Sequence, residues 1–313
     1  MPEFRMTRGM GWLPDYPDFR DYSLESDEIS DKLKSAGQKD SIKTMLSKVG
    51  VQGSKKPSSK TTPKAAPPHA VDLREWCSPI EDQEELGSCT ANACVGVVEY
   101  FERRAFGRHI DASRLFLYKV TRNLMHVEGD TGAYLRSTMG GLVLFGVPPE
   151  EYHPYEIAEF DKEPSAFCYA FAQNFQAINY YRLDPLGTPP DLLLQRVKQW
   201  LSAGLPSMFG FTVYSSISQA SSTGRIPFPT RGERVMGGHA IAAVGYDDNM
   251  KIKNSNSGGE EFKGAFLIRN SWGTGWGDHG YGWLPYEYVL RGLADDWWSL
   301  LKNEWVDTGK FKV

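Results

Sequence analysis

The chain has 313 residues, and its 35 Lys and Arg against 39 Asp and Glu give a formal net charge of −4 at pH 7. This length is enough for one large domain or two small ones with a sizeable core. The near balance of charge gives no reason to expect a nucleic-acid or membrane-surface partner. We also find no apolar run long enough to span a bilayer.

The N-terminal 70 residues differ in composition from the rest. Residues 1–15 lack the apolar segment of a secretory signal, so we expect a cytoplasmic protein or one exported by a non-classical route. Trp12–Tyr22 is aromatic, rich in proline and aperiodic, and residues 50–68 are rich in Lys, Ser and Pro. We therefore expect an N-terminal extension over 1–70 that ends in a mobile linker, followed by a folded domain over 71–313.

A cysteine-bearing stretch follows the linker. In QEELGSCTANAC at 83–94, a Gly-Ser pair leads Cys89 into the first turn of a helix expected over 90–104, with Ser88 as candidate N-cap. A cysteine there lies near unpaired backbone N–H groups and the positive end of the helix dipole, which favours the nucleophilic thiolate. A buried structural cysteine is the alternative, and this stretch alone does not decide between the two.

The remaining segments predict a helix-rich half followed by a strand-rich half. Helices are expected over 110–123, 135–145 and 190–203, and strands over 178–183, 207–216, 237–246, 264–270 and 280–285. Short strands with turn signals between them favour an antiparallel sheet or barrel. The predicted fold class is therefore α+β, with a helical lobe at about 71–176 and a barrel-like β lobe at about 177–300.

Two later motifs carry a histidine and an asparagine. GGHA at 237–240 begins an apolar run, and NSWG at 270–273 ends another. A Cys, a His about 150 residues later and then an Asn is the order found in papain-type peptidases. Together with Asp82-Gln83 before the GSC at 87–89, these motifs make residues 70–300 resemble the papain family of cysteine peptidases. The GSCTANA stretch is similar to the bacterial branch, where it replaces the GSCW of plant and animal members.

The resemblance implies a two-lobed fold with the active-site cleft between the lobes. It also implies hydrolysis of peptides or proteins through a thiolate–imidazolium pair and an acyl-enzyme. On the matching positions Cys89 is the nucleophile, His239 is the base and acid, and Asn270 orients the imidazole. Gln83, six residues before Cys89, matches the side chain of the oxyanion hole.

Four residues are expected to contact substrate or to line its site: Gly132, Tyr134, Gly238 and Trp272. By resemblance, Gly132 belongs to a backbone strip that pairs with extended peptide, and Trp272 shields the Asn–His contact from water. The family usually has two adjacent glycines where this chain has Gly-Ala at 132–133. Tyr134 either lines the second specificity pocket or is a core residue.

The four cysteines bear on the question of disulfides. Family members from oxidising compartments usually link the residue three before the nucleophile to a loop of the same lobe. Those positions correspond here to Leu86 and Asp130, so both partners are lost, which implies a fold that does not rely on disulfides. A pair between Cys77 and Cys168 stays open. No metal or cofactor is expected, because no Cys-x-x-Cys or His-x-x-x-His spacing is present.

By resemblance the extension takes the place of a propeptide. We expect a monomeric, self-restrained zymogen in which Trp12–Tyr22 occupies or borders the cleft, with a disordered tail as the alternative. The loop over 215–236 either narrows one end of the cleft or is a solvated insertion. Two rival functions stay open: a Cys-His acyl transferase or amidase, and a catalytically silent papain-like binding module.

Overall fold

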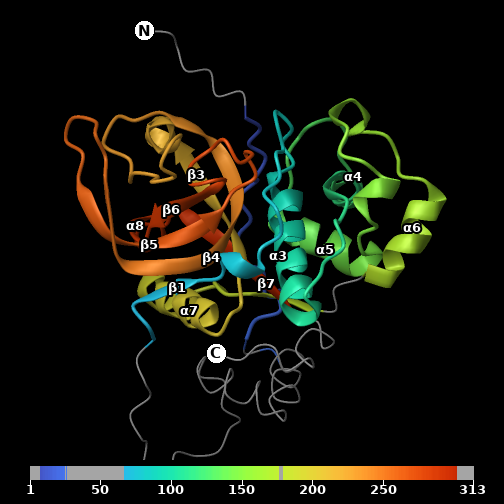
Figure 1. Cartoon of the computed structure of the whole chain (residues 1–313), viewed down its shortest axis with the longest axis horizontal. Helices are drawn as coiled ribbons and strands as arrows, with labels where there is room; N and C mark the ends of the chain where they lie inside the picture. The colour runs from blue at the N-terminus through green and yellow to red at the C-terminus, as the bar shows by residue number, and fades with distance from the viewer. Residues whose placement is uncertain (1–7, 25, 27–66, 176–178, 302–313) are drawn as a thin grey trace, which may run out of the picture.

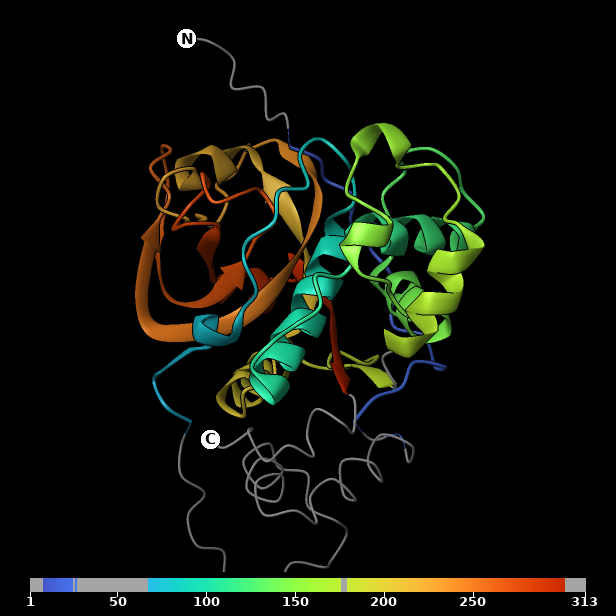
Figure 2. The same ribbon diagram turned by 45° about the vertical axis from the view of Figure 1, so that its right-hand side comes forward.

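The chain folds into a helical lobe and a β lobe, with its N-terminal part running along the boundary between them (Figure 1). The computed structural model describes residues 8–24, 26, 67–175 and 179–301. The predicted linker over 50–68 lies almost entirely outside the described residues. We call residues 8–24 the strap. It is drawn in blue, and it lies between the lobes in both ribbon views (Figure 2).

The helical lobe is built around one buried helix. Its helices are α3 (Cys89–Phe106), α4 (Arg114–Met125), α5 (Leu135–Phe145) and α6 (Ala166–Ala172), with the short 3-10 helices η2 (Glu150–Tyr152), η3 (Ile157–Glu159) and η4 (Gln173–Phe175). Helix α3 is buried on all sides over its first 13 residues, Cys89 to Phe101. Most of this stretch is small or apolar, and its buried polar side chains are hydrogen-bonded: Asn92 donates to the Ser88 carbonyl at 3.1 Å and Glu99 accepts the Ala112 N–H at 3.0 Å.

An antiparallel sheet forms the β lobe. Its strands are β1 (Ala70–Asp72), β2 (Asn179–Arg182), β3 (Ser207–Tyr214), β4 (Val235–Lys253), β5 (Glu261–Arg269), β6 (Tyr281–Pro285) and β7 (Ala294–Leu301). The order is β2-β7-β3-β4-β5-β6, and β1 pairs with β4. Register shifts occur twice where β4 pairs with β5, and such bulges increase the local bend and twist. The predicted α+β class is confirmed.

Three further helices accompany the sheet. They are η1 (Arg74–Trp76), α7 (Pro190–Ser202) and α8 (Glu287–Leu290), and a further 3-10 helix, η5 (Ser215–Ala220), follows β3. Helix α7 begins with proline in its first turn, where the missing N–H costs no intrahelical bond. Its apolar face, which includes Leu193, Val197 and Trp200, is buried and packs against β3 and β4.

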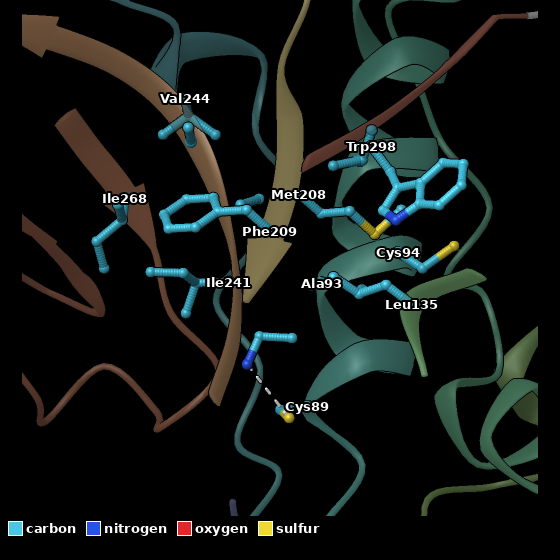
Figure 3. Close-up of a cluster of buried hydrophobic side chains, with 14 of the residues drawn as sticks. Cys89, Ala93, Cys94, Leu135, Met208, Phe209, Ile241, Val244, Ile268 and Trp298 are labelled. Carbon is cyan, nitrogen blue, oxygen red and sulfur yellow. Dashed lines mark hydrogen bonds between the residues drawn. The ribbon is translucent and has the colours of Figure 1, made fainter. Parts of the chain in front are cut away.

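One hydrophobic core joins the two lobes. Side chains of α3, including Cys89, Ala93 and Cys94, meet Met208 and Phe209 of β3 in a single buried cluster (Figure 3). The cluster continues to β4, β5 and β7 through Ile241, Ile268 and Trp298. The N-terminus of α3 is therefore fixed against β4 by packing, and this is where the candidate site lies.

The sequence places most elements correctly but misses several. The bounds of α5 match the expected 135–145, whereas β1, α6 and β7 have no counterpart among the expected elements. Because β1 pairs with β4, residues 70–72 lie in the sheet rather than with the helices. Cys77 and Cys168 are both free and buried, so the pairing left open between them is not formed. None of the helices in the described ranges is long and apolar enough to cross a membrane.

The segment over 215–236 is ordered against the β lobe. Ile217, Ala220 and Ile226 are buried, and the Glu233 carboxylate accepts hydrogen bonds from the Thr230 backbone N–H at 3.0 Å and from the Asn254 amide at 2.7 Å. The segment is therefore packed and internally bonded rather than a solvated insertion. That it narrows the cleft stays a prediction.

Candidate active site

Cys89 is the first residue of α3 and is fully buried. Ser88 occupies the N-cap position as predicted, although its side chain makes no capping hydrogen bond. The Ser88 hydroxyl lies 2.7 Å from the Tyr155 hydroxyl and accepts from the Asn92 amide at 3.0 Å. Because the hydroxyl bonds to these two side chains, it does not cap the first helical turn. The same two bonds fix the position of Ser88 next to Cys89.

The imidazole of His239 is held from one side by an amide. Its Nε2 lies 2.8 Å from Asn270 Oδ1, which also accepts the Ser271 backbone N–H at 2.9 Å. Since the oxygen accepts the Ser271 N–H, the amide orientation is defined, and Nε2 must carry the proton in this contact. The Trp272 ring stacks on the imidazole, with 4.6 Å between centroids and 23° between planes. Trp272 is 2% exposed and covers the His239–Asn270 contact.

Strand β4 brings the histidine to the cysteine. The backbone N–H of Ala240, which follows His239, donates to the Cys89 sulfur at 3.4 Å (dashed line at Cys89 in Figure 3). His239 Nδ1 is buried and has no hydrogen-bond partner among the described residues. With Nε2 engaged by Asn270, Nδ1 is the free basic nitrogen of the ring.

Gln83 is fully buried, and both ends of its side-chain amide are hydrogen-bonded. Its Oε1 accepts from the Ser271 hydroxyl at 2.5 Å, and its backbone N–H donates to the Ser271 carbonyl at 2.8 Å. Its Nε2 donates to the carbonyls of Leu86 at 2.8 Å and of Gly9 at 3.0 Å. The second of these carbonyls belongs to the strap.

The strap pairs with both lobes through its backbone. Trp12 N–H donates to the Gly238 carbonyl at 3.1 Å on the β lobe. On the helical lobe, Leu13 N–H donates to the Ala133 carbonyl at 3.1 Å, and Ala133 N–H donates to the Gly11 carbonyl at 2.7 Å. Trp12 and Ala133 form a parallel bridge. The strap thus runs between the two lobes and is hydrogen-bonded to each of them.

The strap pairs with the residue after Gly132, and the expected pairing of Gly132 with a substrate stays a prediction. Ala133, rather than Gly132, exchanges hydrogen bonds with the strap, while Gly132 donates its N–H to the Tyr118 hydroxyl at 3.1 Å. Tyr134 is the N-cap residue of α5, and 37% of its surface is exposed. Its role in a specificity pocket stays a prediction.

The Trp12 side chain fills a pocket on the β lobe. Its ring lies on Gly210 and Gly238, where a Cβ would come within 1.8 Å and 2.8 Å of ring atoms. Its indole N–H donates to the Asp296 carboxylate at 3.1 Å, and Trp12 is only 4% exposed. The two glycines therefore make the pocket, and a buried carboxylate lies at its base.

Ion pairs fasten the C-terminal part of the strap. Arg136 forms ion pairs with Asp15 and, at 2.7 Å, with Asp21. Arg182 donates through its side chain to the Asp15 carbonyl at 3.0 Å and through its backbone to the Tyr22 carbonyl at 2.7 Å. One arginine comes from each lobe, so the strap is held to both.

Burial changes the ionisation of both reactive groups. It raises the pKa of the Cys89 thiol to about 11, although the facing backbone N–H groups of Ala240 and Gly11 act in the opposite direction. Burial lowers the pKa of His239 to about 4, against the smaller effect of the Asn270 hydrogen bond. Both groups are therefore uncharged across the physiological range while the strap is in place.

Several residues at this site carry no signal in the sequence. Gly210, Asp296 and Tyr155 are single residues in ordinary segments, and each reaches the site through the fold. Trp276, whose ring meets Trp272 edge-on at 5.4 Å, is 9% exposed and packs behind it. Only the WG repeat around these two tryptophans is visible in the sequence.

Comparisons with known proteins agree with this geometry. A family model described as papain family cysteine protease matches residues 67–292. An uncharacterized peptidase C1-like protein of Acanthamoeba polyphaga mimivirus is 34% identical over 236 residues, covering 74% of this chain and 71% of its own. Xylellain, a cysteine protease from Xylella fastidiosa, is 33% identical with a TM-score of 0.68, covering 94% of this chain and 96% of that chain. Cysteine proteinase 2 of Entamoeba histolytica is 26% identical, covering 73% of this chain and 67% of its own.

The fold and the family match define a thiol hydrolase of the two-lobed type. The chain belongs to the papain family of cysteine proteases. It is a cysteine peptidase that hydrolyses peptide bonds.

Proposed function

We propose that Cys89 is the nucleophile of this peptidase, that His239 transfers protons and that Asn270 orients the imidazole. The observation that carries the proposal is the Ala240 N–H bond to the Cys89 sulfur, next to a His239 ring whose Nε2 is held by Asn270. This arrangement leaves Nδ1 as the nitrogen that exchanges a proton with the thiol. Gln83 supplies a side-chain N–H for the oxyanion.

The reaction follows from these roles. The Cys89 thiolate adds to the substrate carbonyl, and the negative charge that develops on the oxygen is stabilised by the Gln83 N–H. Protonated His239 then gives its Nδ1 proton to the departing amine as the carbon–nitrogen bond breaks, which leaves an acyl-enzyme. Water, deprotonated by the same nitrogen, cleaves the thioester and regenerates the thiol pair.

The strap restrains this site in the full chain. Its Gly9 carbonyl takes the Gln83 N–H that the oxyanion would use, and its backbone takes the bonding positions of Gly238 and Ala133. An extended substrate needs the same backbone groups, so the strap and the substrate compete. In this proposal the strap is an inhibitory pro-segment, and Gly238 and Ala133 bind substrate once it leaves.

The strap also keeps the catalytic pair uncharged. With the strap seated, the thiol of Cys89 and the imidazole of His239 are both neutral, because burial disfavours either charge. When the strap leaves, water enters and the proton passes from sulfur to Nδ1. The proton is on the Cys89 sulfur before the strap leaves and on His239 Nδ1 afterwards. The transfer therefore takes up no proton from solvent and releases none.

Thiolate absorbance in the ultraviolet tests this account. The difference spectrum of wild type minus Cys89→Ala is expected to lack a thiolate band at neutral pH, because a thiol with a raised pKa stays protonated until the pH approaches 11. A strap-releasing substitution, Gly11→Ala, is expected to introduce the band at neutral pH when measured against Gly11→Ala/Cys89→Ala, since a histidine-paired thiol ionises at about pH 7 or below. A full thiolate band in the wild type at neutral pH would contradict it.

A further inference from the structure

The loop that precedes the nucleophile, residues 83–88, has no covalent link to the rest of the helical lobe. All four cysteines of the chain are free, so no disulfide holds this loop. The loop contains the Gln83 amide and leads directly into Cys89. Its geometry therefore has to be held by non-covalent contacts.

Asp130 provides such a non-covalent contact to the 83–88 loop. Its carboxylate accepts the Gly87 backbone N–H with both oxygens, Oδ1 at 2.9 Å and Oδ2 at 3.1 Å. A Cβ on Gly87 would lie 2.8 Å from the same carboxylate, so the loop and the carboxylate are in direct contact. Gly87 follows Leu86, whose carbonyl accepts from Gln83 Nε2 at 2.8 Å. The bond to Asp130 thus lies one residue from the group that orients the oxyanion donor.

Asp130 is itself anchored to α4. The Tyr118 hydroxyl donates to Asp130 Oδ1 at 2.6 Å and accepts the Gly132 N–H at 3.1 Å. The pKa of Tyr118 is raised by its burial and by the neighbouring carboxylate, which keeps the hydroxyl protonated as a donor. Arg122, one turn further along α4, donates to the Gly129 carbonyl at 2.6 Å. The loop over 129–132 is therefore bonded to α4 at both ends.

We propose that Asp130 is a positioning residue that holds the 83–88 loop, and with it the oxyanion donor, by joining the Gly87 backbone to Tyr118 of α4. The same short loop continues to Ala133, which pairs with an extended chain in the cleft. Asp130 thus fixes the distance between the nucleophile loop and the backbone that aligns a peptide. The inference rests on the proposed role of Gln83 and Cys89.

The side chain of Asp130 is solvent-exposed, which makes it a clean site for substitution. Its removal leaves no buried hole, and water screens the charge, so the effect should be moderate. Glu128 is an exposed carboxylate of the same loop and serves as the matched control for charge. Asp130→Asn removes the charge but keeps an oxygen that can accept hydrogen bonds from the Gly87 N–H and the Tyr118 hydroxyl.

The test compares two reactions of Cys89 in the full-length Gly11→Ala chain. Peptide hydrolysis needs both the thiolate and the oxyanion hole, whereas alkylation by iodoacetamide needs the thiolate alone. Asp130→Ala is expected to lower kcat for a small peptide amide by about tenfold and to leave the alkylation rate unchanged. Asp130→Asn should recover most of the loss, and Glu128→Ala should show none.

Three results would overturn the inference: unchanged hydrolysis in Asp130→Ala, an equal loss in Asp130→Asn, or alkylation that falls in parallel with hydrolysis. Hydrogen exchange of the Gly87 amide in the otherwise wild-type chain gives a readout that does not depend on turnover. Exchange should be faster in Asp130→Ala than in wild type or Glu128→Ala. Equal rates would contradict the role of Asp130 in holding the 83–88 loop. If Gly11→Ala shows no turnover, the proposal that the strap inhibits the peptidase fails. The hydrogen-exchange experiment still decides the role of Asp130.

Discussion

Replacing Cys89 by alanine in the Gly11→Ala chain is expected to lower kcat for a fluorogenic peptide by on the order of 10⁴ to 10⁶. The sulfur is the only atom of that side chain that can form the acyl-enzyme, and alanine at the start of α3 leaves the helix unchanged. Binding of the peptide should be retained, because Ala133 and Gly238 offer backbone groups that the substitution does not touch.

The matched control is Cys94→Ala. Cys94 is also a fully buried cysteine of α3, and its thiol has a pKa raised by burial. It packs in the core that joins the lobes, so its loss should lower the melting temperature slightly without removing turnover. Turnover that survives Cys89→Ala, or that is lost equally in Cys94→Ala, would assign the nucleophile elsewhere.

Gly11→Ala in the full-length chain is expected to raise peptide turnover by about tenfold to a hundredfold. A Cβ on Gly11 would lie 1.8 Å from the Gly87 carbonyl oxygen and 2.5 Å from its carbon. These are backbone atoms that cannot turn aside, so the strap has to lift from the cleft. That range in the strap equilibrium corresponds to about 1.4–2.7 kcal/mol, which lies within the roughly 1–3 kcal/mol that an overpacked contact costs. Initial rates on a small peptide substrate measure the effect.

Tyr16→Ala is the control within the strap. Tyr16 is 87% exposed, so its side chain contributes little to binding, and turnover should match the wild type. Circular dichroism and melting curves establish that both variants are folded. A folded Gly11→Ala chain with unchanged turnover would mean that the strap does not restrain the enzyme.

The sequence is sufficient to predict the α+β fold and the family. Motifs around Cys89, His239 and Asn270 lie in short local stretches, and their order along the chain carries the identification. The main helices and strands follow from local periodicity, and α5 agrees with its expected bounds because Gly146 and the prolines after it end the helix by local chemistry. Such features need no knowledge of distant contacts.

Other features depend on contacts between distant residues. Ser88 has the residue type of an N-cap, but Tyr155 and Asn92 compete for its hydroxyl, and only the fold brings Tyr155 there. Strand β7 lacks an alternating pattern because it is buried and carries Asp296, whose partners are Arg182 and Trp12. Tertiary hydrogen bonding overrides local propensity at these positions.

The contacts of the strap likewise could not be predicted from local sequence. Its aromatic and proline-rich composition indicates a segment that lies on another surface, but the composition does not name the partner groups. The contact with Gln83 begins at Gly9, before the expected block over 12–22, since a glycine is needed where two backbones meet. Likewise composition does not single out Ala133 as a partner of the strap, because its backbone N–H and carbonyl groups, which any non-proline residue supplies, make the contact.

Peptide mapping after treatment with an epoxysuccinyl inhibitor tests the central claim most directly. All four cysteines are buried and free, so selective reaction reports a reactive site rather than simple exposure. We predict one adduct per chain, on Cys89, that forms faster in full-length Gly11→Ala than in wild type. An adduct on another cysteine, or a folded Gly11→Ala chain in which Cys89 does not react, would contradict a strap-restrained thiol peptidase.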